Sequence, residues 1–182
     1  MCSADLPVHL VAVLALTIPL LLRQLDAAGW RNAAKLGFCF GLGLNTAGLY
    51  WLTNAVLLRA DQFWWLVPLV APLAAVPLAI ATMLPCIAVA LLPRRSVAFD
   101  RLSRVLVFAG VWVVADLIRS VIFTGFPWNL LGSVWEFPGR AGDVMIQPAA
   151  WIGIDGLTLA TVLLAALPTL GARGWAGCMA IL

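Results

Sequence analysis

Long runs of apolar residues make up most of this 182-residue chain, with short polar stretches between them. A helix that crosses a membrane needs about 20 predominantly apolar residues. In lipid, only helices and closed barrels satisfy every backbone hydrogen bond, and these runs do not alternate as barrel strands do. The pattern therefore predicts an all-α, polytopic transmembrane helical bundle of about five spans, near residues 6–22, 36–58, 64–92, 105–122 and 150–170.

Composition supports the same class of protein. Apolar residues make up 64% of the chain and charged residues 10%, with a mean hydropathy of +1.05. Soluble domains carry about 45–50% apolar and about 25% charged residues. We therefore expect residues 1–182 to form one membrane domain with no soluble domain. The net charge of +3 is spread over loops and does not indicate nucleic-acid binding. The four cysteines have no metal-like spacing, and we expect no cofactor and no metal.

The basic residues predict an orientation, because cytoplasmic loops of membrane proteins are enriched in lysine and arginine. The first and third predicted loops are rich in basic residues, whereas the second and fourth are poor in them. The basic residues of the two rich loops are Arg23, Arg31 and Lys35 in the first, and Arg94, Arg95, Arg101 and Arg104 in the third. These loops should face the cytoplasm, which leaves the segment around Pro127 on the outside.

Small residues in the second predicted span indicate close helix packing. Gly37 and Gly41 lie one helical turn apart, a spacing that lets another helix approach its backbone. Asn45 follows one turn later and could hydrogen-bond across that contact. We interpret these three residues as packing residues.

Two charged residues stand inside the fourth predicted span. Asp116 and Arg119 are three residues apart, which places them on one helix face within pairing distance. A charge at membrane depth costs about 2.5–3.5 kcal/mol on insertion scales, so it is retained where it pairs or has a function. One interpretation is a structural ion pair, with Arg119 reaching toward the outer interface. The other is that Arg119 binds a phosphate headgroup, which a guanidinium contacts with two donors.

The segment after this pair predicts a shaped turn at the outer surface. Phe126 precedes Pro127 and is biased toward an extended conformation, so the helix should end near residue 124. Trp128 and Trp135 suit the membrane–water interface. The turn is either an interfacial anchor or the rim of a lipid-binding site. Three residues near the outer end of the second span are weaker candidates for the same site: Tyr50, Trp51 and Asn54. Asp155, in the last span, could be a second partner for Arg119 or be exposed at the interface.

Two motifs carry a resemblance to a known family. The stretches "GFCFGLGLNTAGLYWLTNA" and "ADLIRSVIFTGFPWNLLGSVW" resemble the membrane domain of bacterial apolipoprotein N-acyltransferase, and "QPAAWIGIDGLTLATVLLAALP" is similar to its following helix. The likeness runs from about residue 6 to about residue 170. Family members usually carry glutamate and glycine where this chain has Asp116 and Ser120. The shorter acid keeps the charge of the pair.

The resemblance implies a function in lipoprotein biosynthesis at the bacterial inner membrane. The family's enzymes transfer an acyl chain from a phospholipid to the N-terminal cysteine of a diacylated lipoprotein, through a Glu-Lys-Cys triad in a periplasmic nitrilase-like domain. These 182 residues contain one lysine, Lys35, and one glutamate, Glu136, on opposite predicted sides of the membrane. We therefore predict no catalytic residue here and interpret the chain as a partial member, inactive by itself.

The resemblance and the residues together predict a phospholipid site and a topology. The candidate lipid-binding residues are Arg119, Asp116, Phe126, Pro127, Trp128 and Trp51. The Gly-Phe-Pro-Trp loop should lie on the periplasmic side of a multi-pass protein, with membrane lipids as its surroundings. Two alternatives stay open. One is a small transporter or channel subunit built around the Asp116–Arg119 pair, and the other is a membrane module that binds a separately encoded catalytic chain.

Overall fold

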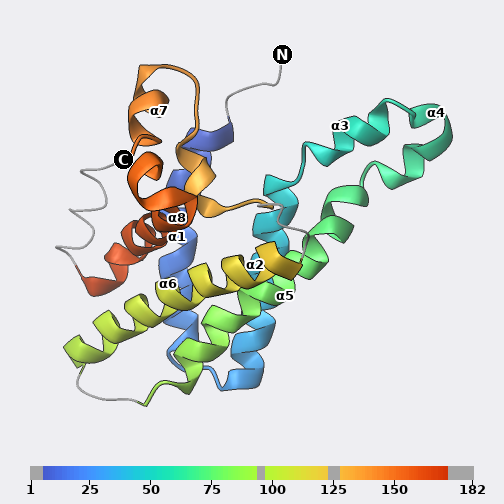
Figure 1. The fold of residues 1–182 in the computed structure, drawn as a ribbon. Helices are drawn as coiled ribbons and strands as arrows, with labels where there is room; N and C mark the ends of the chain where they lie inside the picture. The colour runs from blue at the N-terminus through green and yellow to red at the C-terminus, as the bar shows by residue number, and fades with distance from the viewer. Residues whose placement is uncertain (1–5, 94–96, 123–127, 172–182) are drawn as a thin grey trace.

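A computed structural model describes residues 6–93, 97–122 and 128–171 (Figure 1). This described part is helical and contains no strand. Its α-helices and 3-10 turns (η) are α1 (Leu6–Leu25), α2 (Trp30–Gly48), α3 (Leu52–Leu57), α4 (Ala60–Phe63), η1 (Trp64–Leu66), α5 (Val70–Leu91), α6 (Val97–Ile122), η2 (Leu131–Trp135), α7 (Arg140–Met145), α8 (Ala149–Ala166) and η3 (Leu167–Leu170). The helical membrane bundle expected from the sequence is confirmed.

The long helices pack in a chain of neighbours. α2 lies along α5, α5 packs on α6, and α6 packs on α8, which also contacts α1 (Figure 1). α3, α4 and the start of α5 form a hairpin that extends away from the group made by α1, α6 and α8. The expected second span is therefore two helices, because α2 ends at Gly48 and α3 begins at Leu52. In the expected third span, the continuous helix begins only at Val70.

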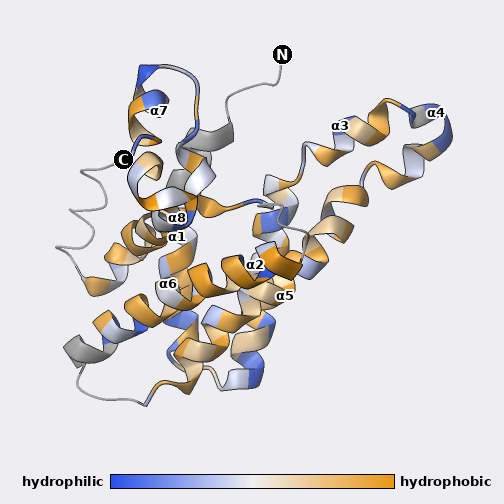
Figure 2. Cartoon of the chain, in the orientation of Figure 1, coloured by the Kyte–Doolittle hydropathy of each residue, from blue (hydrophilic) through white to orange (hydrophobic). Residues whose placement is uncertain are grey.

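In the part of the chain that the structure describes, three helices have the length and apolar composition to cross a membrane: Val70–Leu91, Arg101–Ile122 and Ala149–Leu170. A shorter apolar helix covers Val13–Leu25. Their outward faces carry exposed leucine, isoleucine and valine side chains, and hydrophilic residues gather at α4, at α7 and at the start of α2, while most of α5 is hydrophobic (Figure 2). In water such apolar faces would be costly to expose, whereas lipid tails solvate them. The number of spans stays a prediction.

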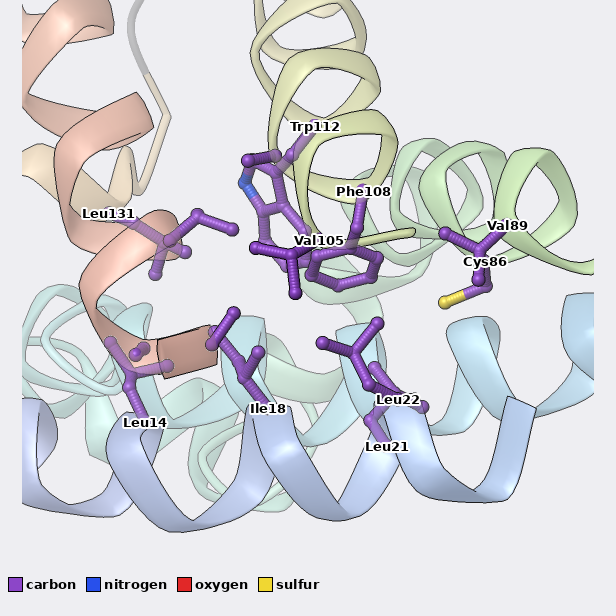
Figure 3. Packing of buried hydrophobic residues seen from close by; sticks show 14 of the residues in the cluster. Leu14, Ile18, Leu21, Leu22, Cys86, Val89, Val105, Phe108, Trp112 and Leu131 are labelled. Atoms are coloured by element: carbon purple, nitrogen blue, oxygen red, sulfur yellow. The ribbon is translucent and has the colours of Figure 1, made fainter. Parts of the chain in front are cut away.

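The main core lies where α1 meets α6 and α8. Leu14 and Ile18 of α1 point toward Phe108 and Trp112 of α6, with Leu131 of η2 beside them (Figure 3). Phe108 and Ile18 are fully buried, and the rings of Phe108 and Trp112 are tilted with centroids 5.5 Å apart. This core fixes α6 against its neighbours and thereby positions the charged residues near both of its ends.

Glycines set the close approach of α2 to α5. A Cβ added at Gly41 would lie 2.5 Å from Thr82 Oγ1 and 3.0 Å from Ala79 Cα, and one at Gly37 would lie 2.9 Å from Cys86 Sγ. Such distances leave no room for a side chain, so the two backbones meet directly. The packing role predicted for Gly37 and Gly41 is confirmed.

Candidate functional site

The C-terminal turns of α6 hold the two charged residues that the sequence singled out. Arg119 Nε lies 2.9 Å from Asp116 Oδ1, in an ion-pair contact between residues three apart. Both residues are buried, with 5% of Asp116 and 7% of Arg119 exposed. The Trp112 side chain, one turn before Asp116, interacts with the same carboxylate. The structural ion pair considered as one interpretation is therefore present, and the protein itself covers most of the Arg119 side chain.

Arg119 also reaches the segment that follows α6. Its Nη2 donates to the backbone carbonyl of Asn129 at 3.4 Å, a long hydrogen bond. Asn129 has a φ of 48°, in the left-handed region that asparagine adopts more readily than most residues. Residues in this conformation occur at sharp turns. The carbonyl that Arg119 contacts therefore belongs to the turn after α6.

Asn129 connects the turn to α2. Its Nδ2 donates to Asn45 Oδ1 at 2.9 Å, and Asn45 Nδ2 donates to the Gly41 carbonyl at 2.8 Å. A Cβ on Gly48 would overlap the Asn129 side chain, so this glycine makes room for it. Asn45 was expected to bond across the Gly41 contact, but its partner outside α2 is Asn129 and not a residue of α5. We call Asp116, Arg119, Asn129 and Asn45 the polar corner.

Trp128 packs beside the polar corner. It is partly buried and lies against the apolar cluster formed by Leu49, Ala71 and Leu78. Trp51 follows Leu49 by two residues and is 52% exposed in the break between α2 and α3. The structure thus brings the Trp128 segment to the end of α2 that carries Trp51. Phe126 and Pro127 lie outside the described residues.

The other tryptophan of this segment is not an interfacial anchor. Trp135 is 7% exposed, and its indole Nε1 donates to Thr161 Oγ1 of α8 at 2.8 Å. One turn earlier in α8, Thr158 Oγ1 accepts from the Gly132 backbone N–H at 2.9 Å. Gly132 is close enough to α8 that a Cβ would lie 2.6 Å from the Ile154 carbonyl oxygen. η2 is therefore docked into the core, because threonine hydroxyls supply the partners that its polar groups need.

Asp155 is not a second ion-pair partner of Arg119 in the described part of the chain. Its carboxylate interacts electrostatically with Asp116 and carries the same charge. Gly153, two residues earlier, has a φ of 71°, and α8 is kinked there. Asn129, Thr158 and Thr161 were not singled out from the sequence. The only signal for Asn129 is its place directly after the Gly-Phe-Pro-Trp stretch, because its partner Asn45 lies 84 residues away.

Two cysteine thiols lie in the part of the chain that the structure describes. Cys39 and Cys86 are free thiols, and Cys86 of α5 is buried next to Gly37 of α2. In the same part of the chain, no group of three histidine, cysteine or acidic side chains could hold a metal ion. Lys35 lies in α2 and Glu136 directly follows η2, with no contact described between them. The contacts of the polar corner position the segment that follows α6 against α2.

Comparisons with known proteins identify the family. The family model described as "Apolipoprotein N-acyltransferase N-terminal domain" matches residues 1–167. Three similar curated proteins are all named apolipoprotein N-acyltransferase. The one from Brucella melitensis is 37% identical over 138 residues, the one from Rickettsia bellii 34% over 133, and the one from Agrobacterium fabrum 35% over 143. No solved structure matches the chain.

These matches cover 76%, 73% and 76% of this chain but only 24%, 25% and 24% of the relatives. The chain therefore spans about a quarter of the length of the curated relatives that it matches. The resemblance inferred from the two motifs is confirmed, and the chain belongs to the apolipoprotein N-acyltransferase family, to whose N-terminal domain it corresponds.

Proposed function

We propose that this chain is the membrane-embedded part of an N-acyltransferase that moves an acyl chain from a phospholipid to the N-terminal cysteine of a diacylated lipoprotein. Its own task is to hold the phospholipid donor beside the polar corner. One observation supports this best: the buried Asp116–Arg119 pair is tied through Asn129 to α2, next to the exposed Trp51. A positioned cation beside interfacial aromatic residues suits a phospholipid headgroup and the start of its chains.

In this proposal the polar corner has two tasks. Asp116 holds Arg119 in place, and Arg119 holds the turn at Asn129, so that Trp128 packs against the end of α2. A guanidinium has five N–H donors, and the described contacts use Nε and Nη2. In this proposal, a phosphate oxygen contacts the guanidinium at the small part of the Arg119 side chain that is exposed, 7% of the residue. Phe126 and Pro127 belong to the proposed site on sequence grounds alone.

We further propose that the chain lies in the bacterial inner membrane with the polar corner toward the periplasm. The basic residues support this orientation. The end of α1, the start of α6 and η3 line one cavity, which contains Arg23, Arg101 and Arg104. Arg119 lies at the opposite end of α6. The 182 residues alone should not transfer an acyl chain, because they contain a single lysine and a single glutamate, which the proposed topology places on opposite sides of the membrane.

Photo-crosslinking tests the donor site. The full 182-residue chain is reconstituted in nanodiscs with phosphatidylethanolamine that carries a photoreactive group near the start of one acyl chain, and labelled peptides are mapped by mass spectrometry. Labels should concentrate at Trp51 and Trp128, and excess phosphatidylethanolamine should displace them while diacylglycerol should not. The Trp128→Ala variant should lower the Trp51 label, whereas Trp30→Ala, at the start of α2, serves as a matched control.

Two results would contradict the proposal. One is labelling spread evenly over the lipid-facing helices. The other is equal competition by diacylglycerol, since a headgroup site must distinguish a lipid that has a phosphate from one that lacks it. A parallel assay with a diacylated lipopeptide should show no acyl transfer by the chain alone. Acyl transfer in this assay would refute the proposal that the chain holds the donor but does not catalyse the reaction.

A further inference from the structure

A second charged site lies at the other end of α6. The end of α1, the first turns of α6 and η3 enclose a half-open cavity of about 360 Å³. Its polar lining includes Arg23 and Asp26 from α1 and the segment after it, and Arg101 and Arg104 from α6. Apolar side chains, among them Leu22, complete its wall. None of these residues takes part in the donor site proposed above.

The cavity carries an excess of positive charge. Among the described residues that line it, three arginines against one aspartate give a formal charge of +2, since three minus one is two. Asp26 has two carboxylate oxygens, whereas three guanidinium groups together present fifteen N–H donors. One carboxylate cannot satisfy them all. An anion with several oxygens would supply the missing acceptors.

Arg104 differs from the other two arginines of the cavity because its side chain is buried. It is 7% exposed, and its Nη2 lies 3.1 Å from Asp26 Oδ1, in an ion pair without hydrogen-bond geometry. The Asp26 side chain is 64% exposed. A buried guanidinium is costly unless several of its donors are occupied. The buried Arg104 side chain lies at the base of the cavity. The exposed side chains of Arg23 and Arg101 lie at its opening and can move to contact a ligand.

We propose that this cavity binds a phosphate group, supplied by an anionic phospholipid headgroup or by a free phosphate ion. Guanidinium forks match phosphate oxygens, so the three arginines suit this ligand. Basic pockets between membrane helices bind anionic headgroups in this way. The apolar side chains Leu22 and Val105 line the same cavity and would contact the glycerol and upper acyl chains of a lipid.

Native mass spectrometry of the full chain provides the test. The chain is transferred from phosphatidylcholine nanodiscs containing increasing phosphatidylglycerol, and retained lipids are counted. Binding of inorganic phosphate to the detergent-solubilised chain is followed by phosphorus NMR. The variants are Arg101→Gln, Arg23→Gln and both together, with Arg31→Gln as the control. Arg31 is exposed, lies in the same predicted cytoplasmic loop as Arg23 and does not line the cavity.

Wild-type chain should retain phosphatidylglycerol in preference to phosphatidylcholine, and each pocket arginine removed should weaken anion binding roughly tenfold. Arg31→Gln removes the same charge but should leave binding unchanged. Phosphatidylglycerol retention that inorganic phosphate competes with identifies a headgroup as the source, and phosphate binding without lipid preference identifies the free ion. The proposal is wrong if Arg31→Gln weakens binding as much as Arg101→Gln, or if the chain binds neither probe selectively.

Discussion

α6 carries a buried arginine near each end, and the two arginines have different kinds of partner. Arg119 pairs at 2.9 Å with Asp116 of the same helix, whose side chain is 6% exposed. Arg104 pairs at 3.1 Å with Asp26, which lies just beyond α1 and is 64% exposed. Both ions of the first pair have lost most contact with solvent, whereas the second pair keeps one ion in it.

This difference separates a closed site from an open one. Two buried ions depend on each other, because neither can recover its solvation without the other. The Arg119 end therefore serves to fix the chain, and its hydrogen bonds continue to Asn129 and Asn45. At the Arg104 end, solvent or a ligand can reach the carboxylate and the neighbouring arginines. Each end makes predictions that the other should not share.

The largest effect is expected from Asp116→Asn. It leaves Arg119 buried without an anion, which costs about 3–5 kcal/mol when a buried pair is broken. We expect a corresponding loss of unfolding free energy, measured by denaturant titration of the purified chain in detergent. Arg119 should also lose its hold on Asn129, so protease should cut more readily near residue 129.

The control for this prediction removes both charges together. Asp116→Leu combined with Arg119→Met replaces the ion pair with apolar groups of similar volume, which is often neutral or stabilising for buried pairs. The double variant should be more stable than Asp116→Asn. If the single and double variants are equally destabilised, the pair does not hold this end by its charges.

The contacts at the two ends of α6 were not equally predictable from the sequence. The Asp116–Arg119 contact follows from a three-residue spacing on one helix, a rule that needs no tertiary information. The close approach at Gly41 was also predictable, because small residues at helical spacing mark a packing face. Local spacing therefore predicts contacts within a helix and the face on which it packs.

Contacts between distant segments could not be predicted in the same way. Asn129 and Asn45 meet across 84 residues, and Arg104 finds Asp26 only because the core between α1 and α6 sets both helix ends side by side. From the sequence, Arg104 was only one of several basic loop residues. Trp135 was expected at the interface for its residue type, but Thr161 gives its indole a buried partner.

A smaller effect is expected from Gly48→Ala, which acts on the polar corner without removing a charge. The added methyl group would overlap the Asn129 side chain and break its hydrogen bond to Asn45. Overpacking of this kind costs about 1–3 kcal/mol. Gly43→Ala is the matched control. Gly43 lies on the same helix, and nothing lies within 4 Å of a Cβ added there. Equal shifts in unfolding free energy for both variants would show that Asn129 adapts freely.

The smallest effect on stability is expected from Asp26→Asn. Its side chain is 64% exposed, and ion pairs with an exposed partner contribute about 0.2–1 kcal/mol and are screened by salt. The loss should shrink as sodium chloride rises, unlike the loss from Asp116→Asn. Among the described residues that line the cavity, Asp26 is the only one with a carboxylate, so this variant should bind inorganic phosphate more tightly than wild type. A stability loss as large as that of Asp116→Asn, together with weaker phosphate binding, would mean that Asp26 holds Arg104 in a closed pair and that the two ends of α6 are alike.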